Sequence, residues 1–97
     1  MARSREESQG SKRMVRFNFK APEGARDVKL CGSFTNWEKG AIRMKNAKSG
    51  EWSATVMLDP GEYQYRFLSD GHWYNDPRAD KQMHNVFGSQ NSVKRIQ

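Results

Sequence analysis

The chain contains a single cysteine, Cys31, which excludes an internal disulfide. We therefore expect a reduced, cytoplasmic protein in which this thiol has a structural role. No apolar run approaches the roughly 18 residues that a membrane-spanning helix needs. The first residues include no apolar segment, so we expect no secretory signal. A chain of 97 residues is also too short for a barrel enzyme or a nucleotide-binding α/β fold.

Aliphatic side chains are scarce, with three leucines, two isoleucines and five valines. So low a content is common in disordered chains. However, there are five phenylalanines, three tyrosines and three tryptophans, and each large ring buries roughly 150–250 Å². We therefore expect one small domain with an aromatic core and limited stability. The formal net charge of +6 leaves anionic partners open.

Residues 1–13 are almost entirely polar, with four basic and two acidic side chains. Such a segment buries too little surface to offset the entropy lost on ordering. We predict a disordered basic and polar N-terminal tail over 1–13 and a folded module over 14–97.

From residue 14 onward, apolar and polar side chains alternate with a period of two, which is typical of half-buried strands. The alternating segments are 14–20, 27–34, 41–45, 51–58 and 62–68, followed by a short strand at 72–74 and a last strand at 91–96. Gly and Pro turn signals separate them. Because no helical stripe occurs, the pattern predicts an all-β antiparallel sandwich or small barrel. We expect residues 75–90 to form one long loop.

Two tryptophans differ from the rest of the aromatic residues because they occur in polar settings. Trp37 lies in the segment TNWEK, and Trp73 follows the Asp70-Gly71 turn beside His72. A tryptophan in such a setting either covers an edge of the core or forms a contact surface. The pattern alone favours neither interpretation.

Four blocks, in order, resemble carbohydrate-binding module family 48, which occurs in the β subunit of AMP-activated protein kinase and ahead of isoamylase and branching-enzyme barrels. The blocks are GSFTNW (32–37), PGEYQYRF (60–67), DGHW with NDP (70–77) and FGSQNSV (87–93). The resemblance implies an immunoglobulin-like antiparallel β-sandwich of the early set type. It also implies non-catalytic binding of α-1,4-glucans such as glycogen, starch and maltooligosaccharides.

The resemblance further implies a carbohydrate-binding site, whose residues follow from their positions in the family motifs. These residues are Trp37, Arg66, Trp73, Phe87, Ser89 and Asn91. This sequence departs from the usual family pattern in three places. Arg66 replaces a lysine and changes a point charge into a planar fork. Phe87 replaces a leucine and enlarges an apolar prop, and Ser89 replaces a threonine but keeps the hydroxyl.

Other classes of function remain as alternatives. The first is a structural or regulatory protein-interaction module with the same fold and no sugar binding. The second is a domain that binds single-stranded nucleic acid through basic and aromatic side chains, although no strand face gathers three or four aromatics. We expect neither a membrane partner nor a cofactor, and a glycogen-metabolising enzyme acting in trans is a possible partner.

Catalysis is not expected. Asp70, Asp76 and Asp80 lie in turns, where aspartate is favoured for local hydrogen bonding. His72, His84 and Cys31 lack the spacing of metal ligands, so no metal site is expected.

Overall fold

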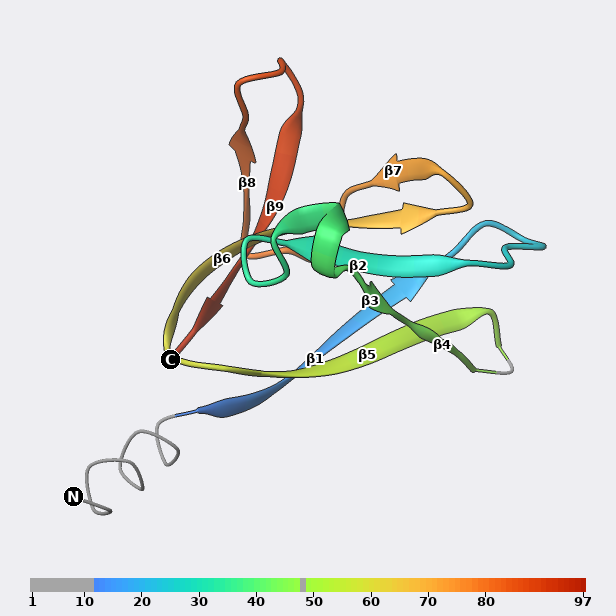
Figure 1. The fold of residues 1–97 in the computed structure, drawn as a ribbon, viewed down its shortest axis with the longest axis horizontal. Coiled ribbons are helices and arrows are strands. Elements are labelled where there is room, and N and C mark those ends of the chain that lie inside the picture. Colours follow the sequence, from blue (N-terminus) through green and yellow to red (C-terminus); the bar gives the residue numbers. More distant parts are fainter. Residues whose placement is uncertain (1–11, 48) are drawn as a thin grey trace.

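A computed structural model describes residues 12–47 and 49–97 (Figure 1). The tail predicted over 1–13 therefore lies outside the described residues, except for Lys12 and Arg13. The described part contains nine strands and one short 3₁₀ helix. The elements are β1 (Arg13–Lys20), β2 (Val28–Gly32), η1 (Trp37–Gly40), β3 (Ile42–Arg43), β4 (Lys45–Asn46), β5 (Glu51–Leu58), β6 (Gly61–Ser69), β7 (His72–Tyr74), β8 (Lys81–His84) and β9 (Gln90–Ile96).

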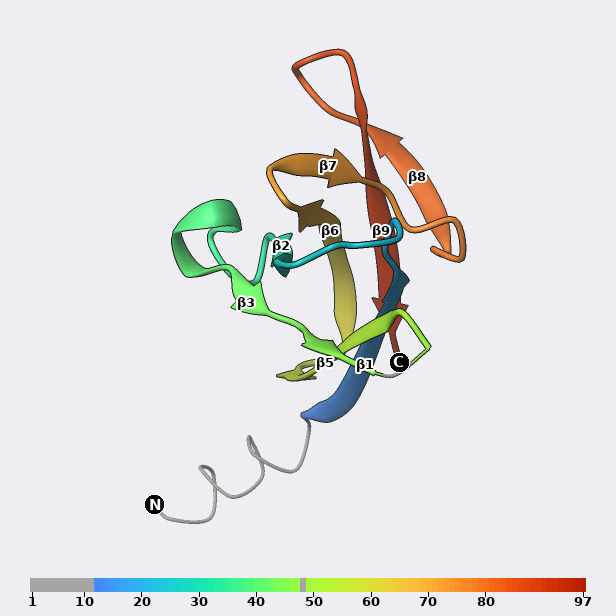
Figure 2. The same ribbon diagram turned by 90° about the vertical axis from the view of Figure 1, so that its right-hand side faces the viewer.

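The strands form two antiparallel sheets, which confirms the predicted all-β sandwich (Figure 2). The smaller sheet has the order β1-β5-β4. The larger has the order β3-β2-β6-β9-β8, with β7 paired to β6. The connections follow the turn signals, since Asp70 and Gly71 both have positive φ and form the tight turn between β6 and β7. No helix among the described residues is long and apolar enough to cross a membrane.

Aromatic rings from both sheets fill the space between them, as the composition predicted. Phe17 meets Tyr65 edge-on at 5.0 Å between ring centroids, and Phe19 stacks on Phe67 at 4.5 Å. All four rings are buried. The strand alternation is confirmed because Trp52 on β5 also points into this core. Five of the ten buried residues of the core cluster are aromatic, so rings make a large contribution to the apolar surface between the two sheets.

Two sequence-based predictions about strands were incomplete. The predicted loop at 75–90 contains strand β8, whose four residues are all exposed and therefore show no apolar alternation. The segment 41–45 is not one strand. It leaves the larger sheet after β3 and joins the smaller sheet at β4, with Met44 buried between them. The main-chain N–H of Met44 donates to the Val28 carbonyl at 2.8 Å, which holds this crossover.

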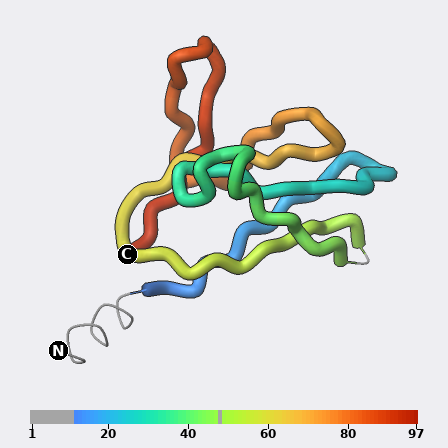
Figure 3. The backbone as a smooth tube through the Cα atoms, viewed as in Figure 1, coloured from blue at the N-terminus to red at the C-terminus, as the bar shows by residue number. Residues whose placement is uncertain are grey.

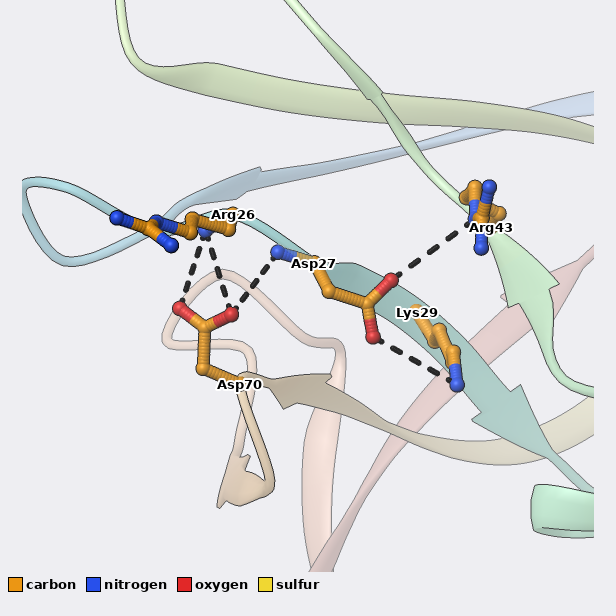
Figure 4. A network of polar contacts seen from close by, with 5 residues as sticks. All are labelled: Arg26, Asp27, Lys29, Arg43 and Asp70. Atoms are coloured by element: carbon orange, nitrogen blue, oxygen red, sulfur yellow. Dashed lines mark hydrogen bonds and ion pairs between the residues drawn. The ribbon is translucent and has the colours of Figure 1, made fainter.

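The hairpin that carries Trp73 is attached to the rest of the fold by Asp70 (Figure 4). Its carboxylate accepts hydrogen bonds from the main-chain N–H groups of Arg26 and Asp27 at 3.0–3.3 Å. Asp27 in turn forms ion pairs with Lys29 and Arg43. Asp70 therefore has a structural role, as its position in a turn indicated, and it ties the β6–β7 turn to the start of β2.

Candidate functional site

The loop between β2 and η1 positions Trp37. It leaves the sheet at Gly32, where a Cβ atom would lie 2.6 Å from the Gln64 carbonyl oxygen, so only glycine fits. The Thr35 hydroxyl then bonds the main chain of Gly32 and of Trp37. Asn36 and Trp37 both adopt positive φ, near +57°, which non-glycine residues rarely do. The hydrogen bonds of Thr35 thus hold the loop in an uncommon backbone conformation at the residue that carries the indole.

Arg66 and Trp73 form a stacked pair on the outer face of the larger sheet. The guanidinium carbon lies 5.6 Å from the centroid of the indole, within the range of a cation–π contact. Arg66 projects from β6, and Trp73 lies on the adjacent strand β7, opposite Leu68. Among the described residues, no acceptor bonds to the buried Nε atom of Arg66. The guanidinium is thus in contact with the indole, and the Trp73 side chain is still exposed enough for another contact.

The hairpin formed by β8 and β9 projects from the body of the molecule (Figure 3). Val86 and Phe87 lie in its loop and are 93% and 89% exposed, so two apolar side chains stand in solvent. Ser89 follows in the same loop, and Asn91 lies on β9, where its side chain is almost fully buried. Exposed apolar side chains at the end of a projecting hairpin are typical of a contact surface rather than a core.

These segments border one open groove of about 800 Å³. All six residues predicted from the motifs line it, although their contact with a ligand stays a prediction. The groove also includes residues that were not predicted as site residues: Glu38, Gln64, His84, Asn85 and Val86. Asn85 and Val86 were not singled out because they lie just before the motif block 87–93. A smaller cavity of about 320 Å³ lies elsewhere, among charged side chains such as Glu62 and Arg95, which form an ion pair.

Neither groove tryptophan belongs to the core cluster, whereas Trp52 does. Trp73 is 37% exposed, and Trp37 is partly exposed. Of the two interpretations left open for Trp37 and Trp73, this position favours a contact surface.

Asp76 and Asp80 make structural hydrogen bonds, as their positions in turns indicated. Asp76 accepts a hydrogen bond from the buried Tyr65 hydroxyl at 2.7 Å, and its own N–H donates to the Ser92 hydroxyl at 2.7 Å. Burial, with a further contribution from this hydrogen bond, raises the pKa of Tyr65, so its hydroxyl stays protonated as a donor. Asp80 accepts from the main-chain N–H of Arg95. No cluster of three metal-ligating side chains occurs in the part of the chain that the structure describes.

Cys31 lies beneath the groove rather than in the core between the sheets. It pairs directly with Arg66 across β2 and β6, so both side chains share the outer face of the larger sheet. The strand alternation placed it on the polar side, yet it is completely buried. Burial raises the pKa of the Cys31 thiol to about 11. The nearby Glu38 carboxylate adds to this shift, and Lys29 opposes it.

We expect Cys31 to react with a thiol reagent at pH 8 more than about 100-fold slower in the folded protein than in urea, because the thiolate is both rare and covered. The raised pKa stabilises the fold below the unfolded thiol's pKa of about 8.5, and this contribution is lost as the pH rises toward 11. Reaction with a disulfide reagent, followed by absorbance, measures both rates. Equal rates in the two states would contradict the burial of this thiol.

An antiparallel sandwich with an aromatic groove on its surface is the architecture of a binding module. Residues 15–97 match the family described as the glycogen recognition site of AMP-activated protein kinase, and the chain belongs to this family. The resemblance to carbohydrate-binding module family 48 is therefore confirmed.

Individual relatives agree with this assignment. The chain is 39% identical over 59 residues to the 5'-AMP-activated protein kinase subunit beta-1 of Sus scrofa, a match that covers 61% of this chain and 46% of that protein. It is 41% identical over 56 residues to Protein PTST homolog 2, chloroplastic, of Arabidopsis thaliana, which covers 58% of this chain and 10% of that protein. The chain thus spans less than half the length of these curated relatives.

A solved structure shares the fold. A maltogenic amylase from S. marinus superposes with a TM-score of 0.69 at 24% sequence identity, over 89% of this chain and 14% of the amylase chain. At this identity the likeness shows the sandwich architecture alone.

Proposed function

We propose that this protein binds α-1,4-glucans such as glycogen, starch and maltooligosaccharides in the groove, without catalysis. One observation carries the proposal. Three separate segments bring Trp37, Trp73 and Phe87 to the border of one groove, which Arg66 and Asn91 also line. Membership of the glycogen recognition family supports the same ligand class.

The chemistry of the groove suits a sugar chain. A glucose ring has apolar C–H faces and a rim of hydroxyl groups. Indole and phenyl faces cover the C–H patches with a large flat surface that carries partial negative charge. The hydroxyl groups need donors and acceptors, which the guanidinium of Arg66, the hydroxyl of Ser89 and the amide of Asn91 provide. Because the three aromatic side chains come from separate segments, they need not lie in one plane, which suits a curved α-glucan better than a flat ribbon.

The open shape of the groove sets the strength of binding. A shallow site exchanges water hydrogen bonds for sugar hydrogen bonds with little net gain. We therefore expect Kd values for maltooligosaccharides between about 1 μM and 1 mM, or roughly −8 to −4 kcal/mol.

An enzyme of glucan metabolism acting in trans on the bound chain is part of this proposal, and co-precipitation from extract with and without glycogen tests it.

Co-sedimentation with glycogen tests the proposed function directly. We expect the protein to pellet with glycogen and not with cellulose, and to do so equally at low and high salt because the ligand is neutral. The net charge of +6 makes single-stranded DNA the matched control ligand, since binding to a polyanion falls steeply with salt. Sedimentation that disappears at high salt, or stronger binding to DNA than to glycogen, would overturn the proposal.

A further inference from the structure

A chain of side-chain amides runs along the groove from the β8–β9 loop to β6. It begins at Asn85, whose Oδ1 atom accepts hydrogen bonds from the main-chain N–H groups of Phe87 at 2.9 Å and Ser89 at 3.2 Å. The oxygen and nitrogen of an amide side chain are distinguished by their partners, and a main-chain N–H can only donate. The orientation of the Asn85 amide is therefore fixed by the backbone of the loop.

The orientation of Asn85 determines that of the next amide. Its Nδ2 atom donates to the Ser89 hydroxyl at 2.9 Å and to Oδ1 of Asn91 at 3.2 Å. Because Asn91 must offer its oxygen to Asn85, its Nδ2 atom faces the other way. That atom donates to Oε1 of Gln64 at 3.0 Å. Each amide in the series thus has one orientation that satisfies its neighbour.

The last amide in the series is that of Gln64. Its Oε1 atom accepts from Asn91, which leaves its Nε2 atom as a donor for another group. Among the described residues, no acceptor bonds to Nε2 of Gln64, and that atom is not among the buried polar atoms that lack a partner. Gln64 lines the groove beside Asn91. Its main chain is also held, because its carbonyl accepts from the N–H of Ser33 at 2.9 Å and its own N–H donates to the Ser33 hydroxyl at 3.3 Å.

We propose that Asn85 is a positioning residue that fixes the amides of Asn91 and Gln64, so that Nε2 of Gln64 is a further hydrogen-bond donor to hydroxyl oxygens of the bound glucan. The inference rests on the proposed function and adds two residues to the six that the family motifs imply. A donor fixed in advance loses little side-chain entropy when the ligand arrives, which is how a shallow groove gains affinity.

The first experiment replaces Gln64 by the nearly isosteric glutamate. At pH 7 the carboxylate in Gln64→Glu still accepts from Asn91 but cannot donate. We expect the Kd for maltoheptaose to rise about two- to tenfold. At lower pH, protonation of the new carboxyl near pH 4.3 restores a donor, and the ratio of variant to wild-type Kd should return toward one. The matched control is Gln90→Glu on β9, which makes the same chemical change at a residue that does not line the groove.

The second experiment replaces Asn85, the first amide of the series, and is designed to reverse the orientations of the two amides that follow. In Asn85→Asp, the new carboxylate still accepts from both main-chain N–H groups but cannot donate to Asn91. The amide of Asn91 then turns its nitrogen toward position 85. Gln64 turns in response and presents its oxygen to the groove. We expect binding to weaken about as much as in Gln64→Glu, and Asn85→Asp to add less than about twofold when Gln64 is already alanine.

Titration calorimetry with maltoheptaose measures these affinities, and thermal melts confirm that each variant is folded. Side-chain amide NMR without ligand gives an independent reading, because the Gln64 amide resonances should shift in Asn85→Asp and not in Gln90→Glu. A wild-type Kd for Gln64→Glu at pH 7 would overturn the donor role of Gln64. If Asn85→Asp weakens binding as much in the Gln64→Ala background as in the wild type, the effect of Asn85 does not pass through Gln64, and its positioning role is overturned. Failure of the wild-type protein to bind maltoheptaose would instead overturn the proposed function itself.

Discussion

Replacing either groove tryptophan by alanine should weaken glucan binding by about 1–3 kcal/mol, or roughly 5- to 150-fold in Kd, the scale of aromatic stacking contacts. Trp73→Ala should have the larger effect, because it also removes the ring on which the Arg66 guanidinium stacks. Neither change should alter the free energy of unfolding by more than about 1 kcal/mol, since both indoles are partly exposed and outside the core cluster.

The measurement is a glycogen or maltoheptaose titration of Trp37→Ala and Trp73→Ala alongside their urea unfolding curves. Phenylalanine at each position is the matched control, because a smaller ring keeps part of the stacking surface and should restore part of the affinity. Variants that unfold early but bind normally would show that the two indoles cover the core, and the site would then lie elsewhere.

Trp52→Ala should give the opposite result and lower the free energy of unfolding by about 3–5 kcal/mol, as expected for a large side chain removed from a packed core. Trp52 is 8% exposed, and it pairs with Phe19 across β1 and β5. A domain of this size has only about 5–15 kcal/mol of stability, so the variant should be close to unfolding at 37 °C.

Urea unfolding at 15 °C measures this loss, and glycogen binding is assayed on the same samples. We expect the folded fraction of Trp52→Ala to keep wild-type affinity, because Trp52 lies on the smaller sheet, which contributes no residue to the groove. The three tryptophans therefore provide one chemical change at three sites with separable outcomes. A Trp52→Ala protein of wild-type stability would contradict the aromatic core.

The strands that could be predicted from the sequence are those with one solvent-exposed face and one buried face. In β1, Val15, Phe17 and Phe19 are buried and alternate with more exposed residues, which is the pattern the sequence shows. Strand β8 was not predicted because all its residues are exposed. Its pairing with β9 therefore produces no alternation of apolar and polar residues in the sequence. Alternation placed Cys31 on the polar face of its strand, and it cannot show that a residue on that face is completely buried.

The site could be predicted only as far as motifs extend. Residues near 37, 66, 73 and 87–91 were identified by resemblance, and the structure brings them to one groove. The series of side-chain amides from Asn85 to Gln64 could not be predicted. It joins residues 21 positions apart through hydrogen bonds that leave no periodic signal in the sequence. Amide side chains are common in loops for many reasons, so only their partners reveal a shared role.

The two ends of the described sandwich lie side by side, with the Arg13 guanidinium Nε 3.1 Å from the Gln97 carbonyl oxygen. Strand β9 then runs from Ile96 back to Gln90, which adjoins the loop of the projecting hairpin, a span of about 20 Å at 3.3 Å per residue. The C-terminal residue and the loop that carries Val86 and Phe87 thus lie at opposite ends of β9. We therefore expect a reporter or a second domain joined after Gln97 to leave the groove open to a polysaccharide chain.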